Sequence, residues 1–567
     1  MQMQILLKLP LDANHGLDSL VGVSRSFHAI VSDLRFAKNH IATVLARRAF
    51  ATNAWKKTAV LKDLVRDLAS VPPFTASATT LSNNQPPPTP FHLLPVSYKG
   101  ALLHELFCEF APVTKASQVQ VFSLVKLSSE EEALKVISIL LENDLRLRSL
   151  DLRKYAASMP RKISWAVVFS WACRFGYYLV VELLLQNQLV DPSLNNCRSF
   201  QLAAKYGHEK IVSQLITHPN VAPDAANNAA VRLASRYGHA KVLSCLLTHP
   251  AIDPSANSNS SIRKSSENGH VGVVRILLAH DSVDAAANGT QLSFSQFPLF
   301  YAHTVGLKIE NYALYKSCEN GHVEIVQLLL VRTHLANDNE NDQQKRHNNP
   351  KYNVDPQARN NIPLRAAAAN GHLEIVNLLL ETAKVDPSAN NNCALGLAAE
   401  NGHVEIVTRL LQDSRVTPAA YNNYALRMAC RNNLVAVVQV LLSDPRADPG
   451  AQNNEAFRTS CMEGHFVVVG LLLGDWRVDP SAAESFGLRV ACERGHFEVV
   501  SALLKDGRSN VHALDRYCLR KAVENGHSKV ADLILEHLER KGGDNKHEEE
   551  CEKDLECSLS LLSLLHE

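Results

Sequence analysis

The chain has 567 residues, 46% of them hydrophobic, and a formal net charge of +1. This length exceeds what one hydrophobic core organises, so several domains or a repeat array are expected. The hydrophobic content excludes a disordered chain, and the balanced charge disfavours a nucleic-acid partner.

The N-terminal region gives no sign of export or of a membrane span. MQMQILLKLPLDANHG lacks the basic start and the small-residue cleavage site of a signal peptide. The most apolar window, AVVFSWACRFGYYLVVELLL, is interrupted by Arg174, Gly176 and Glu182. We therefore expect an intracellular, cytoplasmic protein without a membrane partner.

Residues 1–70 contain LLKLPLDANHGLDSLVGVSRSFHAIVSD, which resembles the latter part of an F-box. The resemblance rests on Val23–Asp33, and the opening helix of an F-box is missing, so the segment is expected to be truncated. F-boxes bind the adaptor subunit of a cullin–RING ubiquitin ligase, and the resemblance implies that partner. The alternative is a helical segment that serves only as a cap. Residues 71–97, with VPPF and NQPPPTPFHLLP, are expected to form a Pro-rich linker.

Residues 98–160 are expected to form a helical capping segment. EEALKVISILLEND (Glu131–Asp144) has the pattern of the second helix of a degenerate repeat. Residues 161–540 are expected to hold eleven copies of one unit with a period of 31 residues. A marker residue, Gly176 in the first copy and Gly526 in the last, recurs at this interval, with Asn433 in one copy. Insertions near 288–309 and 332–353 account for the two irregular intervals, and such a period indicates a stacked array.

The sequence pattern of each copy predicts one helix before the marker and one after it. Apolar residues four, five, eight and nine positions after it form one helix face, as Ile406, Val407, Leu410 and Leu411 do. The residue four before the marker is always Ala or Ser, which indicates close helix contact. Gly and Asn best tolerate the left-handed conformation that ends a helix.

The unit resembles the ankyrin repeat, as LGLAAENGHVEIVTRLL shows. The resemblance implies an all-α solenoid with short hairpin or loop fingers that binds another protein in its concave groove. The period is 31 rather than 33, and forms such as Asn422–Ala429 (NNYALRMA) replace the T-P-L-H opening. Asn is expected to cap the first helix there. Arg stands six positions before the marker in seven copies, from Arg232 to Arg520, in place of the family's His.

The repeated residues are not expected to have catalytic or metal-binding roles. In pairs such as His403 and Glu405, the side chains lie two positions apart and cannot share a ligand on one helix face. The cysteines three before the marker, Cys430 among them, match small apolar residues in other copies. No C-x-x-C, P-loop or G-x-S-x-G pattern occurs. We therefore expect no catalytic residue, no cofactor and no metal, although an active site built on the insertions remains an alternative.

The two residues before each Gly-His pair are the candidate protein-binding positions, because in ankyrin-like arrays they face the groove. The first three copies are basic and aromatic there, and every later copy carries Glu or Asn. Exposed aromatics beside cations are typical binding anchors, although a solvated helix end is the alternative. The predicted groove residues are Arg174, Phe175, Lys205, Tyr206, Arg236 and Tyr237.

The expected partner is a protein with acidic and apolar surface. We expect a non-enzymatic interaction scaffold, with a substrate receptor of a cullin–RING ubiquitin ligase as the alternative. The tail, 541–567, is expected to be charged with a short Leu-rich end.

Overall fold

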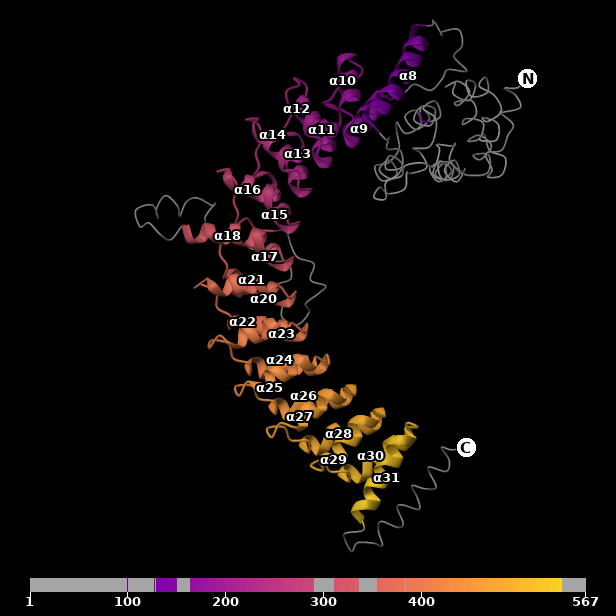
Figure 1. Ribbon diagram of the computed structural model, residues 1–567, viewed down its shortest axis with the longest axis vertical. Coiled ribbons are helices and arrows are strands. Elements are labelled where there is room, and N and C mark those ends of the chain that lie inside the picture. The colour runs from indigo at the N-terminus through magenta and orange to yellow at the C-terminus, as the bar shows by residue number, and fades with distance from the viewer. Residues whose placement is uncertain are drawn as a thin grey trace, which may run out of the picture. The chain divides into compact units, whose positions relative to one another are not determined.

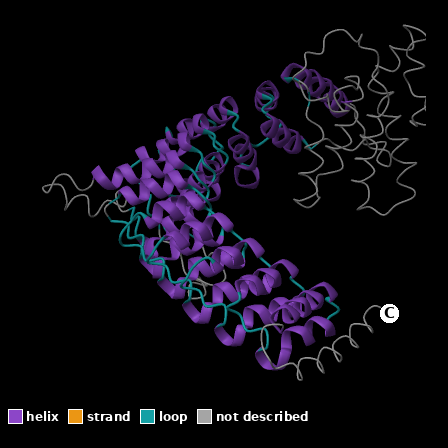
Figure 2. Ribbon diagram, turned by 60° about the horizontal axis from the view of Figure 1, so that its bottom comes forward, coloured by secondary structure: helices purple, strands orange, loops and turns teal. Residues whose placement is uncertain are grey.

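The computed structural model describes Lys99, Leu127 and residues 129–149, 164–289, 311–335, 354–382 and 384–542. Within these ranges every regular element is a helix and no strand occurs (Figure 2). The predicted all-α fold is confirmed. The F-box-like segment at 1–70, the linker at 71–97 and the tail beyond 542 lie outside the described residues.

The chain divides into two compact units, 1–257 and 258–567. The helices of the first unit begin at α8, ahead of the first marker, and continue as pairs. They are α8 (Glu130–Ser149), α9 (Trp165–Phe175), α10 (Tyr178–Gln186), α11 (Leu194–Tyr206), α12 (Glu209–Ile216), α13 (Ala225–Arg236) and α14 (Ala240–Leu247).

The second unit begins just inside α15 and consists of further pairs. Its helices are α15 (Ala256–Glu267), α16 (Val271–Ala279), α17 (Tyr312–Glu319), α18 (Val323–Leu335), α20 (Ala358–Ala369), α21 (Leu373–Glu381), α22 (Ala389–Glu400), α23 (Val404–Leu411), α24 (Ala420–Arg431), α25 (Val435–Ser443), α26 (Ala451–Glu463), α27 (Phe466–Leu473), α28 (Ala482–Arg494), α29 (Phe497–Asp506), α30 (Ala513–Glu524) and α31 (Ser528–Gly542).

Helices of each unit form two layers. In the first unit α9, α11 and α13 pack in one row, and α10, α12 and α14 pack in another. In the second unit the first helices from α17 to α30 pack in sequence, as do the second helices from α16 to α31 (Figure 1). Each pair therefore buries its apolar faces against the pairs before and after it, which is how a repeat too small for its own core becomes stable.

Every marker ends a first helix, as predicted. The ten Gly markers have φ between 75° and 83°, and Asn433 has φ 56°. The glycines also make room for the next copy, since a Cβ on Gly176 would lie 2.5 Å from Nδ1 of His208. Both the left-handed backbone and this close approach favour Gly.

The core lies between the layers. In α23 Ile406, Val407 and Leu410 are buried, and each contributes about 1.5–3 kcal/mol of transfer free energy. The Ala or Ser four before each marker has no exposed surface in any copy, Ala398 included. The five cysteines three before the marker are also buried, as predicted, and burial raises the pKa of the Cys430 thiol to about 12.

A left-handed turn lies at the start of most first helices, just inside the bounds given above, and the sequence did not predict it. Three successive residues have φ between 51° and 61°, although non-glycine residues seldom adopt this region. Asn commonly holds the second and third places, since its short polar side chain tolerates the conformation. The turns are residues 195–197, 226–228, 257–259, 359–361, 390–392, 421–423, 452–454 and 483–485.

The prediction that Asn caps the first helix is wrong. No side-chain cap bond occurs at the start of α24. Instead the Asn423 side-chain oxygen accepts a hydrogen bond of 2.7 Å from the backbone N–H of Asp448 in the next copy. The same bond joins copies at Asn228, Asn259, Asn311, Asn392 and Asn454.

The Arg six before the marker serves the left-handed turn. Arg427 Nε donates to the carbonyl of Asn422 at 3.0 Å, and Arg232 donates to Asn227 at 2.9 Å. Corresponding bonds are made by Arg263, Arg365, Arg458 and Arg489. A guanidinium thus satisfies carbonyls that a left-handed turn leaves without helical partners.

Both insertions leave the stacking of the second unit intact, as predicted. Across the first, Tyr312 on α17 donates to the Glu267 carboxylate on α15 at 3.0 Å. Across the second, α17 packs against α20. Helix α18 continues to Leu335, so the stretch predicted as an insertion from 332 begins as helix.

Helix α8 packs against α10 before the first pair. The Tyr177 hydroxyl donates to the Leu127 carbonyl and accepts from the Leu127 N–H, at 3.1 and 2.7 Å. These contacts join the segment to the first pair. The helices of the described residues include no candidate for a membrane span, since none combines sufficient length with sufficient hydrophobicity.

Candidate protein-binding surface

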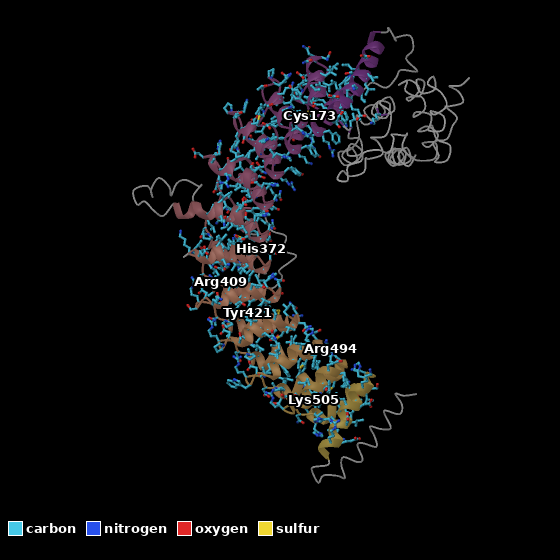
Figure 3. All side chains as sticks on the ribbon, viewed as in Figure 1. Cys173, His372, Arg409, Tyr421, Arg494 and Lys505 are labelled. Carbon is cyan, nitrogen blue, oxygen red and sulfur yellow. The ribbon has the colours of Figure 1, made fainter. Side chains whose placement is uncertain are left out.

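In most copies a His follows the marker and binds adjacent pairs together. Its Nε2 donates to the carbonyl two residues before the preceding marker, at 2.9 Å from His208 to Arg174 and 3.0 Å from His403 to Ala369. His372, labelled in Figure 3, makes the same bond to Glu319. These carbonyls lie at helix C-termini, where intrahelical donors run out. The repeated His is therefore a structural link, as the sequence predicted.

The six predicted groove residues come together in the first unit. They form a continuous row, the basic–aromatic ladder, consisting of Arg174, Phe175, Lys205, Tyr206, Arg236 and Tyr237. All six lie at the C-terminal ends of α9, α11 and α13 or directly after them. Because these helices pack in one row, residues 31 positions apart in sequence become neighbours.

Each cation of the ladder lies near an aromatic ring. Arg174 Cζ is 5.2 Å from the Tyr206 ring centroid, and Lys205 Nζ is 5.1 Å from the centroids of both Tyr206 and Tyr237. The ends are closed by Arg174 over Phe175 at 5.6 Å and Arg236 over Tyr237 at 5.9 Å. All five distances fall within cation–π range, so cations and rings alternate from one copy to the next.

The ladder remains accessible in the described structure. Tyr237 is 43% exposed, and Phe175 and Tyr206 are half-buried. Phe175 is supported from below by Trp171, with ring centroids 6.0 Å apart in an edge-on arrangement. Trp171 itself is fully buried and packs on Tyr177 at 4.8 Å. The first ring of the ladder therefore stands on an aromatic cluster that holds it in place.

The corresponding positions of the second unit serve the repeat itself. Asn320 and Asn432, one before their markers, donate to the carbonyls of Glu267 and Glu400 at 2.7 and 2.9 Å. Arg494, labelled in Figure 3, donates to the Met462 carbonyl. Side chains at this place thus join neighbouring copies and satisfy helix ends.

The Glu side chains at the candidate positions of the second unit are also bound internally. Glu267 accepts from Lys264 and Tyr312, and hydrogen bonds from both help to lower its pKa against the opposing effect of burial. Glu400 accepts from Tyr424 at 2.9 Å. Such carboxylates are less available to a partner than their sequence position suggests, which distinguishes them from the ladder.

A second recurring motif, Asp-x-Arg, clamps the fingers of the second unit and was missed from the sequence. Arg446 pairs with Asp444 at 2.6 Å and donates to the carbonyls of Val416 and Leu411 in the preceding copy. Arg477 and Arg508 repeat both carbonyl bonds, and Arg415 pairs with Asp413 and makes the first of them. Their 31-residue spacing was the available signal. Hydrogen bonds from Arg446 hold the pKa of Asp444 below its usual value.

One finger of this series carries an exposed aromatic side chain. Trp476 is 88% exposed and stands between the clamped Asp475 and Arg477. It borders an open hollow of about 600 Å³ that is also lined by Leu442, Pro445 and Leu471 among others. In the part of the chain that the structure describes, no three His, Cys, Asp or Glu residues group to hold a metal ion.

Comparison with known families agrees with this architecture. A family model of ankyrin repeats (3 copies) matches residues 169–258, 285–391, 344–419 and 364–455. The chain therefore contains ankyrin repeats. Helices α28 and α30 lie beyond the matched ranges and end at Gly markers with the same left-handed geometry. The search of curated proteins found no match to the sequence.

Proposed function

We propose that this protein is a non-enzymatic scaffold that binds a partner protein on the basic–aromatic ladder. The observation that carries the proposal is the alternation of three cations with three rings across consecutive copies. The ladder contains no acid, so it favours a partner with carboxylates and apolar groups. Aromatic and Arg side chains are the usual anchors of protein interfaces.

The contrast between the two units supports this choice of surface. In the second unit several of the side chains before the marker bond to neighbouring copies, as those of Asn320, Asn432 and Glu267 do. In the first unit the same positions carry aromatic rings, whose carbon surface satisfies no helix end. Their side chains are therefore available for a function other than folding.

The test compares two triple charge reversals in the full-length protein. The first replaces Arg174, Lys205 and Arg236 of the ladder by Glu. The second makes the same charge change at Arg198, Lys210 and Lys241, which are exposed in the same unit but away from the ladder. Reversing Glu267, Glu319 and Glu400 is a poorer control because their carboxylates hold internal bonds.

The measurement uses partner proteins captured by the wild type and identified by mass spectrometry. The ladder variant should lose at least tenfold in affinity for a purified partner, and the control variant should stay within twofold. The wild-type association rate should fall as salt rises, because cations steer an acidic partner. Equal binding by the two variants would show that the contacts lie elsewhere.

We further propose that residues 161–540 form eleven ankyrin repeats, one for each helix pair from α9 and α10 to α30 and α31. Residues 98–160 then cap the first repeat, which the contact of α8 with α10 supports. Hydrogen exchange of the full chain would test this organisation into repeats, since neighbouring repeats should gain or lose protection together. We also propose that the protein is located in the cytoplasm.

A second candidate function is that of a substrate receptor in a cullin–RING ubiquitin ligase. The F-box-like segment Val23–Asp33 favours it, with the repeats holding the substrate and the segment holding the adaptor. Co-purification of adaptor and cullin with the wild type, lost on replacing Phe27 and Ile30 by Asp, would support this function. If the wild type captures other proteins but neither ligase subunit, only the scaffold function is supported.

A further inference from the structure

We propose that the ladder recognises a polyproline II segment with a carboxylate at every third residue. This inference rests on the proposed function and names the partner's local chemistry. It follows from how the ladder repeats. Arg174, Lys205 and Arg236 come from successive copies, and the helices that carry them pack directly against one another. Packed helices lie about 8–10 Å apart, so the cations recur at about that distance.

Among extended ligands, one conformation matches this period. A polyproline II helix rises about 3.1 Å per residue with three residues per turn, so every third side chain returns to the same face after about 9.3 Å. A β-strand covers a similar distance in three residues, but its side chains alternate and every third one faces the other way. Three carboxylates on one polyproline II face can therefore meet three cations in register.

The rings between the cations are suited to contact proline side chains of such a ligand. Tyr206 lies between Arg174 and Lys205, and Tyr237 lies between Lys205 and Arg236. Aromatic surfaces bind proline-rich segments well, because the preformed helix loses little entropy on docking. In an acid-Pro-Pro repeat, one row of prolines adjoins the carboxylate row and would pack on the rings.

Lys205 holds the centre of this arrangement. Its Nζ is equidistant from the two tyrosine rings, and within the described residues it forms no ion pair. A ligand carboxylate at this point gains a charge partner without displacing an internal one. The central carboxylate should therefore contribute most to recognition, and the ligand must span both neighbouring copies.

The experiment measures binding of synthetic peptides to the full-length protein by calorimetry. The test peptide is acetyl-EPPEPPEPP-amide. Its control, acetyl-EPEPEPPPP-amide, has the same composition and charge, but its carboxylates point to different faces of the polyproline II helix. A third peptide is an alanine helix with Glu at every seventh position, a spacing of about 10.5 Å along an α-helix.

The test peptide should bind at least tenfold more tightly than either of the other two. Replacing Arg174, Lys205 and Arg236 by Glu should remove that preference, while the reversal at Arg198, Lys210 and Lys241 should keep it. A milder variant, Lys205→Gln, should weaken the test peptide about threefold and guards against misfolding of the triple variant. Thermal unfolding of each variant checks that the fold is retained.

Equal affinity for the two proline peptides, or tighter binding of the alanine helix, would overturn the inference. So would a preference that survives charge reversal of the ladder, because the peptide would then bind elsewhere. If captured protein partners still depend on the ladder in these cases, the proposed function stands and only the ligand class is wrong. If neither peptide nor partner depends on it, both proposals fail.

Discussion

The Nε2 atom of His403 lies 3.0 Å from the main-chain oxygen of Ala369, 34 residues earlier in the chain. This contact explains why Gly-His recurs through the sequence. Ala369 ends helix α20, where its carbonyl has no helical donor, and Gly371 leaves space for the ring. The Gly of each Gly-His pair thus ends the first helix of its own copy, and the His joins that copy to the one before.

Replacing His403 by Ala should destabilise the surrounding copies by about 1–3 kcal/mol, because a shielded carbonyl loses its donor. His403→Leu should cost less, since Leu434 occupies the equivalent place and approaches Gly402 in the same way. Urea unfolding checks both. Glu405→Gln is the control, and its exposed side chain should change stability by less than about 0.5 kcal/mol. Equal losses of stability in His403→Ala and Glu405→Gln would instead indicate that the two side chains act together.

Replacing Asn423 should lower the stability of the protein for two separate reasons. Asn423→Gly keeps the left-handed backbone but loses the bond to Asp448, which should cost about 1–3 kcal/mol. Asn423→Ala adds the strain of a left-handed residue, about 1–2 kcal/mol more. Urea midpoints would separate the two. Asn422→Gly, at the exposed position beside it, should be nearly neutral. Similar midpoints for the Gly and Ala variants would contradict the role of backbone strain.

The left-handed turn also shows why part of the fold could not be predicted from the sequence. The marker glycines revealed the helix pairs, because few residues tolerate a left-handed helix end and the period repeats them. The Asn pairs were ambiguous, since Asn favours both helix caps and left-handed backbone. Only the position of Asp448 beside Asn423 decides between these roles. That contact spans 25 residues and leaves no local pattern.

The candidate surface had a similar limit. The sequence placed Arg174, Lys205 and Arg236 in one row because they share a phase in the repeat, and the cation–π distances agree with that grouping. The same phase placed Glu267 and Glu400 in the row as well. Their hydrogen bonds to Tyr312 and Tyr424 could not be foreseen, because each tyrosine comes from the following copy.

Removing the hydroxyl of Ser266 should stabilise the protein. The side chain is fully buried, and its oxygen has no hydrogen-bond partner among the described residues. Ser266→Ala should therefore raise stability by about 1 kcal/mol, since an unpaired buried hydroxyl carries an uncompensated desolvation cost. Ser317→Ala is the matched control, because that hydroxyl is equally buried but donates to Ala313 at 2.8 Å. A gain at Ser317 as large as that at Ser266 would contradict this explanation.

Asp444 should make the second unit sensitive to acid. Hydrogen bonds from Arg446 hold the pKa of the folded carboxyl below its usual value of about 4. The unfolded chain therefore binds a proton more readily, so the contribution of Asp444 is present above about pH 4 and is lost as pH falls through the folded pKa. Asp444→Asn should lower the urea midpoint at pH 7, and the difference from wild type should shrink between about pH 5 and pH 2.

The clamp on the preceding copy gives this prediction a second test. Arg446→Gln should reduce the acid sensitivity of Asp444 and should also loosen the fingers, since Arg446 donates to Val416 and Leu411. Hydrogen exchange should then rise around Asp448, the next finger residue to be held from the copy before. Asp532→Asn on α31, an exposed carboxyl outside the clamp, should leave the pH dependence unchanged. A midpoint difference for Asp444→Asn that stays constant from pH 7 to pH 2 would show that the carboxyl's charge contributes nothing, and that the clamp works through its geometry alone.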